Sequence, residues 1–92
     1  MNYSEFETIQ KIKKSAAAIR KEEKELAKRE KALAEDQQLA QRLGLDRSAE
    51  SQTVRASAEA AVHSMRAKVA EMKVAHNKFV QENGLGSELF PE

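Results

Sequence analysis

The sequence has 92 residues, of which 34% are charged and 4% aromatic, with no cysteine and no tryptophan. A chain of this length forms one domain at most, and the lack of cysteine excludes disulfides, thiolate metal sites and thiol chemistry. Its 16 basic and 15 acidic residues nearly cancel, so the chain as a whole is not a polyelectrolyte. No apolar run is long enough to span a membrane and no signal-peptide pattern is visible, so we expect a cytoplasmic protein with no membrane partner.

The segment from about 4 to 43 is predicted to form the first helix. Ser4 followed by Glu7 fits a capping box, in which both side chains satisfy free backbone N–H groups at a helix start. Apolar residues then recur every three or four positions, the spacing of one helical face. The large ones are Ile9, Ile12, Ile19, Leu26 and Leu33.

Polar residues interrupt this apolar face at Glu23, Glu30 and Gln37. Either the face rotates toward Ala27 and Ala34, or the second half of the helix packs loosely. We expect the rotation, because alanine at every seventh position continues the apolar stripe on its other side.

Nine lysine and arginine residues fall within residues 11–31. Five of them define a basic stripe on the first helix: Lys14, Lys21, Lys24, Lys28 and Lys31. A face of this kind is ordinarily a solvated helix surface; alternatively it follows a phosphate backbone or an acidic partner. Aromatic residues that could stack on bases are missing from it, so any nucleic-acid binding is expected to be weak and non-specific.

The residues Leu43-Gly44-Leu45-Asp46 predict a turn at about 43–47. Gly44 can take the left-handed conformation that ends a helix, and Asp46 or Ser48 can cap the next one. We therefore predict an all-α fold of two long antiparallel helices, a helical hairpin or antiparallel coiled coil. The chain is expected to be one domain, 1–92, with a second helix from about 47 to 83 and a short tail at 84–92.

The second helix carries a seven-residue repeat of apolar positions: Val62, Met65, Val69, Met72, His76 and Phe79. The repeat continues to Asn83, and Gly84 marks the helix end. His76 is expected to be buried in the seam with one hydrogen-bond partner, a register device or pH sensor being the alternative. Antiparallel pairing about the turn places Glu23 level with Arg66, with the large apolar residues gathered at the end that holds both termini.

Two helices alone cover each apolar side chain on one side only, which predicts a further partner. Self-association into a dimer, with four helices in a bundle, is the simplest solution. The predicted self-association seam consists of Ile9, Ile12, Ile19, Leu26, Leu33, Val62, Met65, Val69, Met72, His76 and Phe79.

The tail contains two adjacent large apolar residues, Leu89 and Phe90. We expect them to fold onto the helices; alternatively they form a short docking peptide. Ser87-Glu88-Leu89-Phe90 resembles the end of the peptide that binds the bacterial sliding clamp, although Gly86 stands where that peptide has glutamine. The resemblance implies a docking role for the tail.

No catalytic, metal-binding or cofactor-binding constellation is present: His63 and His76 are 13 residues apart, which is not ligand spacing. We expect a non-enzymatic protein–protein interaction module without a cofactor: an adaptor, assembly factor or inhibitor of a larger complex, of the kind common in phages and mobile elements. The alternative is binding to a nucleic-acid backbone through the basic stripe. A structural or secreted subunit is a third class: the outline resembles the secreted helical hairpins with a Trp-x-Gly turn, but Arg42-Leu43-Gly44 stands here and their export signal has no match.

Overall fold

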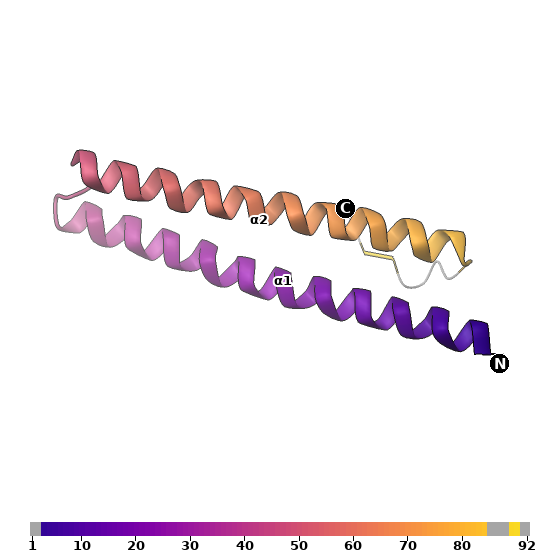
Figure 1. Ribbon diagram of the computed structural model, residues 1–92. Coiled ribbons are helices and arrows are strands. Elements are labelled where there is room, and N and C mark those ends of the chain that lie inside the picture. The colour runs from indigo at the N-terminus through magenta and orange to yellow at the C-terminus, as the bar shows by residue number, and fades with distance from the viewer. Residues whose placement is uncertain (1–2, 85–88, 91–92) are drawn as a thin grey trace. The chain divides into compact units, whose positions relative to one another are not determined.

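The computed structural model describes residues 3–84 and 89–90, which contain two helices and no strand. Helix α1 covers Tyr3–Arg42 and helix α2 covers Ala49–Glu82, 40 and 34 residues respectively. Figure 1 traces α1 in purple and α2 in orange, with the turn between them. The predicted all-α helical hairpin is confirmed, whereas the four-helix bundle stays a prediction.

The start of α1 differs from the prediction. The helix already includes Tyr3, so Ser4 lies inside it and is not its N-cap. The Ser4 carbonyl accepts a hydrogen bond from Thr8 Oγ1 at 3.0 Å, a bond of residues one turn apart within a helix. The capping box fails here because an N-cap residue must be non-helical, and the residue before Ser4 is already helical.

The turn follows from the residues that were predicted to make it. Gly44 has a φ of 70°, and the two hydrogen bonds of a Schellman motif close the end of α1. They run from Leu45 N–H to the Ala40 carbonyl at 2.8 Å and from Gly44 N–H to the Gln41 carbonyl at 3.2 Å. Ser48, one of the two predicted caps, is the N-cap of α2: it precedes the helix, and its Oγ accepts the Ser51 N–H at 3.0 Å.

The chain forms two compact units, which we call the terminal unit (residues 1–23 and 68–92) and the turn unit (residues 24–67). In each unit a segment of α1 lies antiparallel to a segment of α2. In the terminal unit, Ser15 contacts His76 and Glu23 contacts Lys73. In the turn unit, Glu30 contacts Arg66 and Gln37 contacts Glu59.

The terminal unit has a well-covered apolar core. Five apolar residues from both helices are 5% exposed or less: Ile12, Ala16, Ile19, Val69 and Val80. His76 lies among them at 2% exposure. By contrast, Val62 is the one buried residue of the turn unit, which the structure describes throughout. The turn unit therefore has much less of a core than the terminal unit.

The polar residues of the α1 seam stay in the seam, so the predicted rotation toward Ala27 and Ala34 is wrong. Both alanines are exposed, while Glu23, Glu30 and Gln37 are half-buried. With only one partner helix, the flanks of the contact remain open to water. A long polar side chain can therefore cover the seam with its stem and keep its head group solvated.

Ion pairs across the helices differ from the predicted partner of Glu23. Glu23 was expected beside Arg66, but Glu23 pairs with Lys73 at 3.2 Å and Arg66 pairs with Glu30 at 3.4 Å. The helices themselves are not shifted, because Ser15 contacts His76 at 2.8 Å and Glu22 pairs with Lys68 at 3.7 Å, both within two residues of the predicted level. The long side chains of Glu23 and Lys73 instead reach along the helices to meet. Partly exposed pairs of this kind contribute about 0–1 kcal/mol each, so they add little to the stability of the fold.

Candidate functional site

The tail contacts the helix that it follows, through the side chain of Asn77. Phe90 N–H donates to Asn77 Oδ1, and Asn77 Nδ2 donates to the Phe90 carbonyl, each at 2.8 Å. One amide thus satisfies both main-chain groups of a single residue. An extended residue can be held in this way because its N–H and C=O point to the same side, as they do along a sheet edge. The main chain of the tail is therefore anchored at Phe90.

The ring of Phe90 lies against side chains from both helices of the terminal unit. It meets the His76 ring nearly edge-on, with centroids 5.0 Å apart and planes at 79°. Arg20 of α1 places its guanidinium carbon 5.8 Å from the Phe90 centroid. Edge-to-face contacts contribute about 0.5–1.5 kcal/mol beyond burial, and cation–π contacts at exposed sites about 0.5–1 kcal/mol. Leu89, by contrast, is 40% exposed, so of the two predicted docking residues only Phe90 is held.

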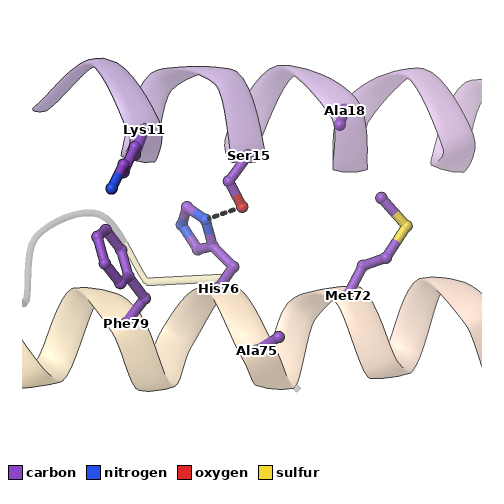
Figure 2. Close-up of a pocket in the computed structure, with 7 residues that line it drawn as sticks. All are labelled: Lys11, Ser15, Ala18, Met72, Ala75, His76 and Phe79. Atoms are coloured by element: carbon purple, nitrogen blue, oxygen red, sulfur yellow. Dashed lines mark hydrogen bonds between the residues drawn. The ribbon is translucent and has the colours of Figure 1, made fainter. Parts of the chain in front are cut away.

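His76 is buried as predicted and links the two helices. Its Nδ1 and the Ser15 hydroxyl are hydrogen-bonded at 2.8 Å. A groove of about 360 Å³ opens beside this pair between α1 and α2. Figure 2 shows Lys11 and Phe79 at one end of the groove and Met72 at the other. The hydrogen bond fixes the orientation of the His76 ring, which matters because the same ring contacts Phe90.

A second groove, of about 410 Å³, lies in the turn unit between the end of α1 and the start of α2. We call it the turn groove; its apolar lining consists of Leu33, Ala40, Leu45, Val54 and Ala58. Leu45 and Val54 are 51% and 63% exposed. The large apolar residues were predicted to gather at the end that holds both termini, yet the turn end also presents large apolar side chains to solvent.

The predicted self-association seam lies in the contact between α1 and α2 of one chain. Five of its residues are buried: Ile12, Ile19, Val62, Val69 and His76. The other six are half-buried: Ile9, Leu26, Leu33, Met65, Met72 and Phe79. Packing within a single chain thus already covers much of this seam, and an assembly that used its buried residues would have to separate the helices.

Three residues of the terminal unit were missed by the sequence reasoning. Val80 is fully buried, while Asn83, which the heptad places in the seam, is exposed. Val80 is four residues after His76 and three after Asn77, so the three share the face of α2 that Phe90 contacts. Val80 could have been found from the sequence, because it is an apolar residue beside the heptad seam. No sequence pattern pointed to Arg20 or Asn77, because their roles depend on where the tail lies.

The basic stripe is exposed in both units. Lys14 and Lys21 belong to the terminal unit, and the other three lysines, Lys24, Lys28 and Lys31, to the turn unit. Within the described part of the chain, none of the five forms an ion pair. The acidic residues Glu22, Glu23 and Glu30 of α1 pair instead with cations of α2. These three acids of α1 thus pair across the helix contact rather than with the lysines of the basic stripe.

Among the described residues, no three His, Cys, Asp or Glu side chains gather closely enough to hold a metal ion. Neither α1 nor α2 has an apolar stretch that could cross a membrane. The notable arrangements among these residues are two exposed surfaces, the turn groove and the basic stripe, and the site that holds Phe90. The sequence matches no protein-family model, and comparisons with curated proteins and with solved structures likewise find no match.

Proposed function

We propose that the protein is a small, cytoplasmic, non-enzymatic protein–protein interaction module that acts through its turn groove and its tail. The observation that carries the proposal is the exposure of large apolar side chains in the turn unit. Leu39, Leu43, Leu45 and Val54 are 46–63% exposed there, in a unit with one buried residue. Of these four, Leu45 and Val54 lie together in the turn groove, and clustered apolar exposure is typical of surfaces that another macromolecule covers.

A second copy of the chain is the partner to test first. Asp36, Glu50 and Arg55 stand among the lining residues of the turn groove. Neither acid forms an ion pair within the range 3–84. A twofold contact between two copies brings the acids of one groove near the arginine of the other, so the surface is complementary to itself. Adaptor, assembly factor and inhibitor of a larger complex, in a phage or a cell, are all roles that such a dimer can serve.

Sedimentation velocity at micromolar concentration tests the proposal with a matched pair of variants. Val54→Lys places a charge in the turn groove, whereas Val74→Lys places one on the same helix in the terminal unit, at 67% exposure against 63%. We expect the wild type and Val74→Lys to be dimers, and Val54→Lys to be a monomer with unchanged helix content. A wild-type protein that stays monomeric at 100-fold higher concentration would contradict self-association. Dimers of equal stability in both variants would contradict the turn groove as the contact.

Binding to a nucleic-acid backbone is the second candidate, and the unpaired lysines of the basic stripe favour it. Three phosphate contacts predict a loss of about 40-fold in affinity for duplex DNA between 50 and 200 mM salt. Replacement of Lys14, Lys21 and Lys28 by glutamate should abolish this binding, while Lys78→Glu, an exposed change on α2, should weaken it little. Fluorescence anisotropy measures both. Binding that resists salt or selects a sequence would contradict this candidate.

A further inference from the structure

Phe90 occupies a site built by side chains of both helices in the terminal unit: Arg20, His76 and Asn77. We propose that these three residues form a peptide-binding site whose ligand is an aromatic residue in an extended chain. The chain's own Phe90 fills this site in cis, and the tail of a second copy is the ligand that competes with it. This inference gives the tail a specific role within the proposed function, and it rests on that function.

Asn77 supplies recognition of the main chain. Its amide makes both hydrogen bonds that a neighbouring strand would make with a residue of an extended peptide, each at 2.8 Å. Such pairing gives affinity without regard to sequence, as in strand addition to a sheet edge. Because Asn77 is half-buried on a regular helix, its amide is presented by a rigid element. The site therefore accepts an extended segment and excludes a helical one, whose N–H and C=O groups are already bonded.

Arg20 and His76 supply selectivity for an aromatic side chain. A guanidinium above the ring and an imidazole edge-on to it both require a π face or a ring edge, which an aliphatic side chain lacks. His76 is 2% exposed and bonded to Ser15 at 2.8 Å, so its ring is already oriented for the contact. A group that is held before binding loses little freedom on binding, which favours affinity.

The ligand of a second copy must compete with the tail of the same chain. Phe90 lies only 13 residues after Asn77, and a short connection gives an intramolecular ligand an effective concentration of about millimolar. The cis tail thus keeps the site filled against micromolar peptide. Leu89 is left 40% exposed beside it, which offers a free apolar side chain next to the anchor. The site opens to another chain only when the Phe90 contacts are lost.

The test uses the full-length Phe90→Ala variant, which lacks the ring contacts, and a fluorescein-labelled peptide of residues 84–92. Fluorescence anisotropy should show saturable binding to this variant and at least tenfold weaker binding to the wild type, where the cis tail competes. Adding Asn77→Ala should weaken binding at least tenfold. Adding Gln81→Ala instead, which removes an exposed amide from the same helix, should leave binding unchanged. A peptide with leucine in place of Phe90 should bind at least tenfold more weakly.

Two results would overturn the proposal: no binding of millimolar peptide to Phe90→Ala, or equal binding with and without the Asn77 amide. Circular dichroism checks that each variant keeps its helix content. If Asn77→Ala loses helix, Asn77→Asp replaces it, because the carboxylate keeps the size and the acceptor but cannot donate to the Phe90 carbonyl. The peptide-binding assay does not involve the turn groove. A negative result in this assay therefore does not affect the sedimentation test with Val54→Lys, and a negative sedimentation test does not affect the peptide-binding result.

Discussion

Truncation of Ile19 to alanine is the sharpest test of where the stability of this protein lies. Ile19 is fully buried in the core of the terminal unit. Removing three carbon atoms forfeits about 2.4 kcal/mol at about 0.8 kcal/mol per buried methylene. Alanine recovers a few tenths of a kcal/mol through its helix propensity, and the remaining cavity adds to the loss. Because the open flanks of a two-helix contact can relax, we expect a total loss of about 2–3.5 kcal/mol, in the lower part of the range for such truncations.

Leu39→Ala is the matched control, since it also removes three carbons from α1 but at a side chain that is 46% exposed. Its expected cost is below about 1 kcal/mol, as for most surface changes. Urea unfolding followed by circular dichroism gives both values from the shift in midpoint at constant slope. Equal losses for the two variants at a protein concentration that keeps the chain monomeric would refute the reasoning, because burial within one chain would then not set the stability.

Two further predictions concern the turn. Ser48→Ala removes the acceptor for the Ser51 N–H and should lower the free energy of unfolding by about 1 kcal/mol. Ser48→Asp should retain most of the stability, because a carboxylate can also accept this bond. Equal urea midpoints for the wild type and Ser48→Ala would contradict the cap. Gly44→Ala should lower the free energy of unfolding by about 1–2 kcal/mol, because a φ of 70° strains any residue that has a Cβ. Steric clash is not the cause, since a Cβ added at Gly44 would meet no neighbouring side chain or main chain within 4 Å. Gly44→Asn should cost less than alanine, because asparagine tolerates this conformation, and a smaller loss for alanine than for asparagine would argue against strain as the cause.

The sequence by itself determined the parts of this protein that depend on neighbours along the chain. Helix propensity and the shortage of breakers set the two helices, and Gly44 with Ser48 set the turn between them, because a left-handed glycine and an N-cap act within one helical turn. The seven-residue repeat also identified the buried side of each helix, including Ile19 and His76. Each of these inferences needed only the spacing of residues on one helix.

Tertiary structure alone decided what depends on which segments meet. Long charged side chains reach partners above or below their own level, so the heptad repeat could not tell that Glu23 pairs with Lys73. The open flanks of a two-helix contact decided that a polar residue such as Glu23 stays in the seam rather than turning away. The role of Asn77 depends on the position of Phe90, a contact that follows from no pattern within α2. Local spacing fixes which face of a helix is apolar; the path of the chain in space fixes what covers that face.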